Sequence, residues 1–251
     1  MGTETRENIT RVMLLNVPVD IISPEQLSSV VYEFLSDEKE HNIVLLSLWD
    51  LLRARRNNDY RSYVLNASLI VPISKSLISG IKFLTGKRAN RYMPFDFIVS
   101  MLTILENREF SCYLLGSRTK ILLKTEKNIR QTFPKLRIVG RFPGFFKKHE
   151  EPTILKAIKK ASPSLLLAGK GIRGKERWIH KNNASLGNGM RLWCSDIFEV
   201  FAEKKRHPSR GAFERGLEWI GYCFQKPHKF FRVFPYIYYK ILLVVYRLFV
   251  K

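Results

Sequence analysis

The chain has 251 residues, with 43 Lys and Arg against 22 Asp and Glu, and a formal net charge of +21. The length suits one medium domain, or one domain with an appendage, and the 45% of apolar residues excludes a wholly disordered chain. Three widely spaced cysteines, Cys112, Cys194 and Cys223, exclude a disulfide framework and fit a reducing setting. The polar start predicts no signal peptide. Nucleic acid, membrane phospholipid and phosphorylated substrates all remain open as partners of the positive charge.

Local signals predict alternating strands and helices. Residues 1–10 are predicted to be a disordered polar tail, and the apolar run 12–15 a buried strand that ends at Pro18. Ser23, with Pro24 after it and Gln26 three residues on, predicts a helix that runs to about residue 36. Further strands are predicted at 43–47, 69–72, 111–115, 136–139, 164–169 and 190–194. Further helices are predicted at 49–56, 95–106, 120–132, 154–161 and 175–182.

This alternation predicts an α/β fold: a Rossmann-like, mainly parallel sheet with helices on both faces. The pattern changes near Asp196, where charged and aromatic residues begin to mix. We therefore expect an α/β domain over residues 11–197 and a helical, membrane-binding appendage over residues 198–251. A helical patch is expected at 216–220.

Two glycine-bearing loops follow predicted strands and open predicted helices. One begins at Gly116 and contains Arg118, and the other runs from Gly169 through Gly171 to Lys175. Because ligands of open parallel sheets bind at the carboxyl ends of strands, the backbone N–H groups and cations of these loops are candidates to bind a diphosphate. The glycine spacing alone is a weak motif without an acidic ribose ligand, and ordinary strand-to-helix turns are an equal alternative for either loop.

The sequence offers carboxylates but no metal motif. Its five histidines lie far apart and lack metal-ligand spacing, so neither a metal nor another cofactor is expected. Carboxylates near the predicted strand ends are candidate acids or bases, although such groups are more often solvated or helix-capping. These carboxylates are Asp50, Asp96, Glu176, Asp196 and Glu199.

Several blocks in order carry a family resemblance. Residues 132–140 with Pro143-Gly144-Phe145-Phe146 are similar to a family block written "erfPglrivG…hGYF". Residues 154–171 resemble "I..s.PDlllvGlG", 175–179 "KQEkWi", 198–199 "FD", 202–208 "aGkvkRAP", 216–219 with 227–229 "GLEWl…ePrR", and 86–96 "GkplpeRvtGsDl". Together, over roughly residues 14–234, the chain resembles the WecG/TagA/CpsF family of bacterial glycosyltransferases.

The resemblance implies transfer of a sugar, often of N-acetylmannosamine type, from a UDP donor to a polyprenyl-diphosphate-linked sugar at the cytoplasmic membrane face. It also implies inversion at the anomeric carbon, no obligatory tightly held metal, and self-association. Such chemistry needs a base for the acceptor hydroxyl and positive charge for the departing UDP. The loops and the resemblance together give these candidate substrate-binding residues: Ser47, Arg91, Asp96, Gly116, Arg118, Gly169, Gly171, Lys175, Glu176, Phe198, Glu199, Arg206 and Arg210.

The chain departs from the family where the base is expected. The family's "PDG", which carries that base, reads Pro72-Ile73-Ser74 here and holds no carboxylate. The family's "NAD" strand end corresponds to residues 47–50. Asp50 or Asp196 is expected to serve as the base instead, and Ser74 is a third catalytic candidate. Because loss of a base costs roughly 10²–10⁴-fold in rate, two alternatives stay open: a shifted chemistry, or a sugar-nucleotide or lipid-diphosphate binding or regulatory protein with impaired catalysis.

The last residues are aromatic and basic. Residues 202–251 hold 11 Lys and Arg against 3 Asp and Glu, and 230–250 predict a helix interrupted by cations. This pattern favours an interfacial helix on an anionic membrane over a helix that docks on the core. Because the resemblance implies work at the cytoplasmic membrane face, we expect a cytoplasmic protein that is peripheral on the inner face of the cell membrane. Nucleic acid is disfavoured because no nucleic-acid-binding motif is present. The candidate membrane-binding residues are Arg232, Tyr236, Tyr239, Lys240 and Arg247.

Overall fold

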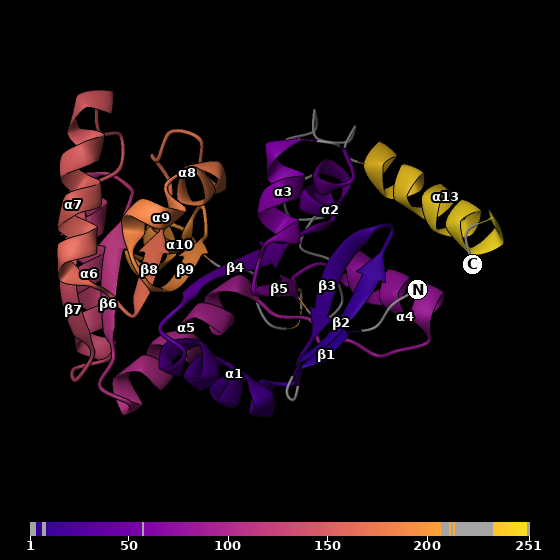
Figure 1. The fold of residues 1–251 in the computed structure, drawn as a ribbon, viewed down its shortest axis with the longest axis horizontal. Helices are drawn as coiled ribbons and strands as arrows, with labels where there is room; N and C mark the ends of the chain where they lie inside the picture. The colour runs from indigo at the N-terminus through magenta and orange to yellow at the C-terminus, as the bar shows by residue number, and fades with distance from the viewer. Residues whose placement is uncertain are drawn as a thin grey trace.

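A six-stranded parallel sheet forms the centre of the protein (Figure 1). The computed structural model describes residues 4–6, 9–56, 58–206, 211, 213 and 233–249. The strand order is β5-β4-β9-β8-β6-β7, and every neighbouring pair is parallel. The predicted α/β fold with a mainly parallel sheet is therefore confirmed. The strands are β4 (Glu40–Leu46), β5 (Leu69–Pro72), β6 (Ser111–Leu115), β7 (Arg137–Phe142), β8 (Leu165–Ala168) and β9 (Gly189–Trp193).

A small antiparallel sheet precedes it and differs from the prediction. Its strands are β1 (Glu4–Arg6), β2 (Ile9–Leu14) and β3 (Val17–Ile21). Leu15 and Asn16 form a two-residue turn in which both residues have positive φ, the geometry of tight hairpins. Pro18 lies inside β3, opposite Met13, and so does not end a strand. Residues 4–6 and 9–10 are paired strands rather than part of a frayed tail.

Helix α1 (Pro24–Ser36) forms as predicted, with reciprocal capping hydrogen bonds between Ser23 and Gln26. The predicted helices 49–56, 95–106, 120–132, 154–161 and 175–182 are present with boundaries shifted by up to three residues. Four helices, α3, α4, α9 and α10, and the 3₁₀ turn η1 were not predicted. The bounds are α2 (Leu48–Ala54), α3 (Asp59–Leu65), α4 (Lys75–Thr85), α5 (Pro94–Asn107), α6 (Thr119–Thr132), the 3₁₀ turn η1 (Lys148–Glu150), α7 (Glu151–Ala161), α8 (Glu176–Lys181), α9 (Asn183–Leu186), α10 (Ile197–Phe201) and α13 (Val233–Phe249).

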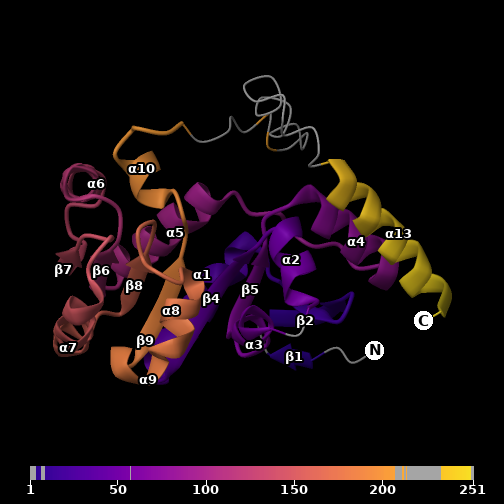
Figure 2. The ribbon, with the colours of Figure 1, turned by 90° about the horizontal axis from the view of Figure 1, so that it is seen from above.

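Helices cover both faces of the parallel sheet. On one face, α1, α5, α6 and α10 pack on a core that includes Ile43, Leu114 and Leu192. On the other face, α7, α8 and α9 cover β6 and β8, and the small antiparallel sheet with α2, α3 and α4 covers β4 and β5. Figures 1 and 2 show α7 and α13 at opposite ends of the long axis.

The predicted boundary between residues 197 and 198 falls inside α10. Phe198, Phe201 and Ala202 are buried, and Phe198 and Phe201 belong to the same core as the sheet. The α/β domain therefore continues through α10. The predicted helical patch at 216–220, together with Arg210, Cys223 and Arg232, lies outside the described residues.

Helix α13 docks one side on α4. Tyr239 and Leu243 are buried there, and the Tyr239 hydroxyl donates to the Ser76 carbonyl at 3.0 Å. Tyr239 therefore packs in the core, which corrects its predicted place among lipid headgroups. The Tyr246 hydroxyl adds a bond to Asn16 Oδ1 at 2.8 Å. Among the described helices, none has both the length and the apolar character needed to cross a bilayer.

Candidate functional site

A cavity of about 310 Å³ opens at the carboxyl ends of β4 and β9. After β4 the chain enters α2 on one face of the sheet, whereas after β9 it enters α10 on the other face. Neighbouring strands whose connections leave to opposite faces create the crevice in which open α/β sheets bind their ligands. The predicted residues that line this cavity are Ser47, Asp50, Glu176, Asp196 and Arg206.

Asp50 lies in the first turn of α2 and is held by Ser47 at the end of β4. The Ser47 backbone N–H donates to Asp50 Oδ2 at 3.1 Å, and the Ser47 hydroxyl donates to the same oxygen. Burial raises the pKa of the Asp50 carboxyl above its usual range. The Ser47 hydrogen bonds and the Arg53 cation lower it, and the Glu176 carboxylate raises it.

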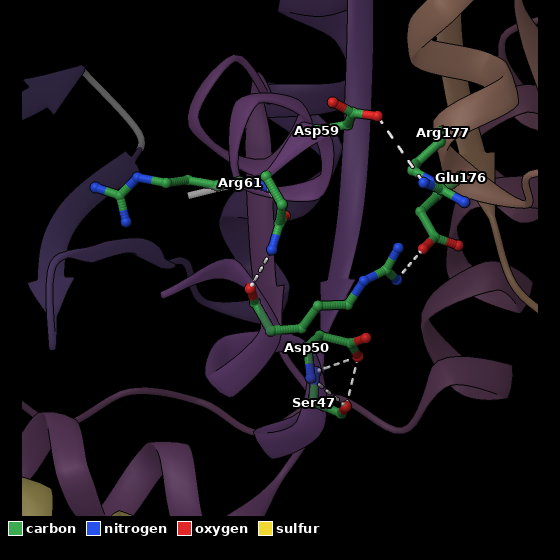
Figure 3. Close-up of polar contacts among 8 residues, drawn as sticks. Ser47, Asp50, Asp59, Arg61, Glu176 and Arg177 are labelled. Atoms are coloured by element: carbon green, nitrogen blue, oxygen red, sulfur yellow. Dashed lines mark hydrogen bonds and ion pairs between the residues drawn. The ribbon is translucent and has the colours of Figure 1, made fainter. Parts of the chain in front are cut away.

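Glu176 begins α8 and reaches the cavity from the opposite side (Figure 3). Its buried carboxylate forms an ion pair with Arg53 of α2. The Arg53 guanidinium also lies 3.9 Å from the ring centroid of Tyr60, a cation–π contact. Burial raises the pKa of the Tyr60 hydroxyl, and Asp50 and Glu176 raise it further, so Tyr60 stays protonated and can donate to a ligand.

The other wall of the cavity comes from the segment after β9. Asp196 is ion-paired with Lys205, and both side chains are about two-fifths exposed. Arg206 lines the cavity and makes no ion pair with a described residue. The indole N–H of Trp193 is buried and has no acceptor among the described residues. Arg206 and Trp193 therefore offer a cation and a donor to a ligand.

The strand-end glycines, which were predicted to bind a diphosphate, lie outside the cavity lining and have a packing role. A Cβ at Gly169 would come within 2.7 Å of the Phe198 ring, and one at Gly116 within 2.9 Å of the Gly169 nitrogen. Gly171, with φ of +96°, lies against the Phe145 ring in the same way. Phe198, predicted to bind substrate, is instead buried in the core.

The backbone N–H groups of these loops already have acceptors. Gly116 donates to the Phe142 carbonyl at 3.0 Å, Gly169 to the Leu115 carbonyl at 2.9 Å, and Lys170 to the Ser195 carbonyl at 3.1 Å. Glu199 accepts from the Ser117 hydroxyl at 2.9 Å, which joins α10 to one of the loops. The loops therefore bind each other and α10, and they leave few N–H groups for a phosphate.

Four more predicted residues lie away from the cavity lining. Arg91 donates to the Ile73 carbonyl at 3.0 Å and to the Phe213 carbonyl, and it stacks on the Phe213 ring. The Ser74 hydroxyl accepts from the Leu48 backbone N–H at 3.0 Å, which gives it a structural role in place of the predicted catalytic one. The remaining two are exposed at helix starts: Arg118 and Lys175.

Sequence reasoning missed Arg53, Tyr60 and Trp193, which all belong to the site. Tyr60 stands on α3, a helix that the sequence analysis did not predict, and Trp193 ends β9 beside Cys194. Asp96 of α5, predicted to bind substrate, does not line the cavity, although Met93, Pro94 and Phe95 before it do. Among the described residues, no three His, Cys, Asp or Glu side chains are grouped closely enough to hold a metal ion.

The chain was compared with known proteins. The model of the glycosyl transferase WecG/TagA/CpsF family matches residues 12–251. An N-acetylglucosaminyldiphosphoundecaprenol N-acetyl-beta-D-mannosaminyltransferase of Staphylococcus aureus is 21% identical over 222 residues, which cover 88% of this chain and 87% of the relative. The enzyme of the same name from Bacillus spizizenii is 20% identical over 218 residues, covering 86% and 84%. The family match spans almost the whole chain and confirms the resemblance seen in the sequence blocks: the chain belongs to the WecG/TagA/CpsF family of glycosyl transferases.

Proposed function

We propose that the protein transfers an N-acetylmannosamine-type sugar, or a related hexose, from a UDP donor to N-acetylglucosamine linked through diphosphate to a polyprenol. The observation that carries this proposal is the cavity at the switch point of the sheet, lined by carboxylates and a cation, in a chain with a family match over residues 12–251. The activity named for the Staphylococcus aureus and Bacillus spizizenii relatives supports the choice of sugars.

The charges around the cavity fit a displacement at the anomeric carbon. Such a reaction needs positive charge near the departing diphosphate and a base near the acceptor hydroxyl. Arg206 is the candidate for the diphosphate, because it lines the cavity and is not neutralised by a described carboxylate. Arg53 and Lys205 already pair with Glu176 and Asp196 and so contribute less net charge.

The proposed transfer is a step in the biosynthesis of cell-surface polysaccharide or glycopolymer, and the proposed place of work is the inner face of the cell membrane. Helix α13 supports peripheral attachment, because the side opposite its docked face is apolar and exposed. Lys240 and Arg247 are also exposed, and a cation near an anionic bilayer adds about 1 kcal/mol; the Arg247 guanidinium lies 4.5 Å from the ring centroid of Phe83 on α4. The exposed apolar side chains are Phe234, Ile237, Tyr238, Ile241, Val244, Val245, Leu248 and Phe249.

The transfer reaction is tested with purified protein, a panel of UDP-sugars and a short-chain lipid diphosphate that carries N-acetylglucosamine. Released UDP and the disaccharide lipid are both measured. We expect both products, with UDP-N-acetylmannosamine or a close analogue as donor. UDP binding without any product would contradict the transferase proposal and favour a binding protein.

Membrane attachment is tested by co-sedimentation with vesicles that contain a quarter phosphatidylglycerol. Ile241→Glu places a charge on the exposed side of α13 and should reduce binding by at least about tenfold. Leu123→Glu is the matched control, since Leu123 is similarly exposed but lies on α6 (47% against 56%). Equal binding of the two variants would contradict attachment through α13.

We also propose that the protein self-associates, which light scattering in solution measures directly.

A further inference from the structure

Three carboxylates line the cavity, and their partners distinguish them. Glu176 pairs with Arg53, and Asp196 pairs with Lys205. Asp50 makes no ion pair with a described residue, and both hydrogen bonds to its carboxylate come from Ser47 and end on Oδ2. Its other oxygen, Oδ1, accepts no hydrogen bond from the described part of the chain. One oxygen is thus fixed, and the other remains able to accept a proton.

We infer that Asp50 is the general base of the transfer reaction and that Ser47 is the positioning residue that holds its carboxylate. This inference rests on the proposed function. Oδ1 of Asp50 takes the proton of the acceptor hydroxyl while the hydroxyl oxygen of the acceptor bonds to the anomeric carbon of the donor sugar. The bond from that carbon to the diphosphate oxygen breaks, and its electron pair leaves with UDP. The proton then passes from Asp50 to solvent.

The surroundings of Asp50 suit a base. Burial disfavours the ionised carboxylate, and this raises the pKa of Asp50 towards the pH at which a base is most effective. Each neighbouring element contributes a group: Glu176 of α8 raises that pKa, whereas Arg53 of α2 and Ser47 lower it, and Tyr60 of α3 interacts with Asp50 electrostatically. Asp196 is less suited, because it is neutralised by Lys205 and is two-fifths exposed.

The alternative role of Asp50 is structural, since it completes the capping box of α2 with Ser47. Asp50→Asn separates the two roles. An asparagine keeps the side-chain oxygen that accepts from Ser47, but it cannot take a proton. We expect kcat to fall by about 10²–10⁴-fold with the dissociation constant of UDP unchanged. Asp59→Asn is the matched control: Asp59 is 81% exposed on α3, pairs with Arg177, and lies apart from Asp50 (Figure 3).

The pH dependence gives a second readout. Wild-type kcat/KM should fall as the pH drops through the raised pKa of Asp50, because a protonated carboxyl cannot accept a proton, and Asp50→Asn should lose this acidic limb. Ser47→Ala removes a hydrogen bond that lowers the pKa, so its acidic limb should move to higher pH. If the Ser47 hydroxyl only fills space, the acidic limb of the Ser47→Ala profile should stay at the wild-type pH.

Stability provides a readout that needs no substrate. A carboxyl whose pKa is raised on folding destabilises the fold above that pKa, and this cost disappears below the unfolded-state pKa. Asp50→Asn should therefore be at least as stable as wild type at pH 7, with the difference closing as the pH falls. A capping role alone predicts full kcat in Asp50→Asn and a stability difference that does not change with pH, because asparagine keeps the oxygen that accepts from Ser47.

The outcomes separate the two proposals. A wild-type protein that makes no product with any donor contradicts the proposed function, and the base assignment falls with it. An active wild type with full activity in Asp50→Asn contradicts the base assignment alone. A large loss in Asp196→Asn together with near-normal activity in Asp50→Asn would overturn the inference in favour of Asp196.

Discussion

Gly80 is the position on α4 where a small change tests the docking of α13. A Cβ at Gly80 would lie 1.9 Å from the Tyr239 hydroxyl oxygen and 3.1 Å from the ring carbon that bears it. The Tyr239 side chain is fully buried, and its hydroxyl donates to the Ser76 carbonyl at 3.0 Å. Gly80→Ala therefore forces the phenol away from Ser76 or lifts α13 off α4.

The expected cost follows from opposing contributions. Loss of the Tyr239–Ser76 hydrogen bond costs about 1 kcal/mol, and forcing a methyl group into a filled space costs about 1–3 kcal/mol. Alanine is favoured over glycine inside a helix by roughly 0.5–1 kcal/mol, which offsets part of this. The docking of α13 should therefore weaken by about 1–3 kcal/mol.

Hydrogen exchange of residues 233–249, followed by mass spectrometry, measures this cost. We expect exchange to accelerate by about 5- to 150-fold in Gly80→Ala, the factor that corresponds to 1–3 kcal/mol. Lys82→Ala, which changes an exposed residue of the same helix, is the control. Tyr239→Phe removes the clashing oxygen, so Gly80→Ala should weaken the docking of α13 less in a Tyr239→Phe background than in the wild type. Unchanged protection of α13 with higher overall stability would refute the docking geometry.

Three further predictions concern the described residues. Gly169→Ala should lower the free energy of unfolding by about 1–3 kcal/mol, because the new Cβ meets the Phe198 ring at 2.7 Å; loss of UDP affinity at unchanged stability in urea would restore the phosphate-loop interpretation. Asp20→Ala should cost about 3 kcal/mol or more in thermal unfolding, because buried Asp20 accepts from Arg11 and from the Ile70 N–H at 2.7 Å; a loss below about 1 kcal/mol would contradict this. Cys194 is half-buried on the cavity lining, and its desolvation raises the pKa of the thiol to about 12. The thiol therefore stays protonated at pH 8, and iodoacetamide should modify it at least about 100-fold more slowly in the native than in the unfolded chain; rapid native labelling in peptide maps would be inconsistent with that raised pKa.

Local signals predicted the elements whose structure is decided locally. In α1, the cap residues Ser23 and Gln26 act as the sequence indicates, and the apolar positions of the helix are the buried ones. The β2–β3 hairpin was missed because its determinants are not local. Its turn uses Leu15 in a left-handed conformation that apolar residues rarely adopt, and the Arg11–Asp20 pair joins residues nine positions apart.

The candidate site was predictable in part, because parallel strands bring their carboxyl ends together. Asp50 after β4 and Asp196 after β9 therefore meet at one cavity although they lie far apart in the chain. Arg53 and Tyr60 were missed because their role depends on how α2 and α3 pack. The glycine loops illustrate a limit of sequence patterns, because a glycine indicates only that something approaches the backbone closely. At Gly116 the approaching group is the backbone of Gly169, and at Gly169 it is the ring of Phe198.

The excess of positive charge is distributed unevenly along the chain. Residues 1–116 hold 13 Lys and Arg and 13 Asp and Glu, so the excess lies elsewhere, with 13 against 3 in residues 117–160. Beside the cavity, Arg53 is neutralised by Glu176; of the two cations on the lining, Lys205 pairs with Asp196, and Arg206 lacks a described partner. The net charge therefore says little about the reaction, which depends on the balance inside the cavity. Among the described residues, that balance places a carboxylate without a counter-ion, Asp50, in the same cavity as a guanidinium without one, Arg206, and the proposed group transfer between a hydroxyl and a diphosphate requires both.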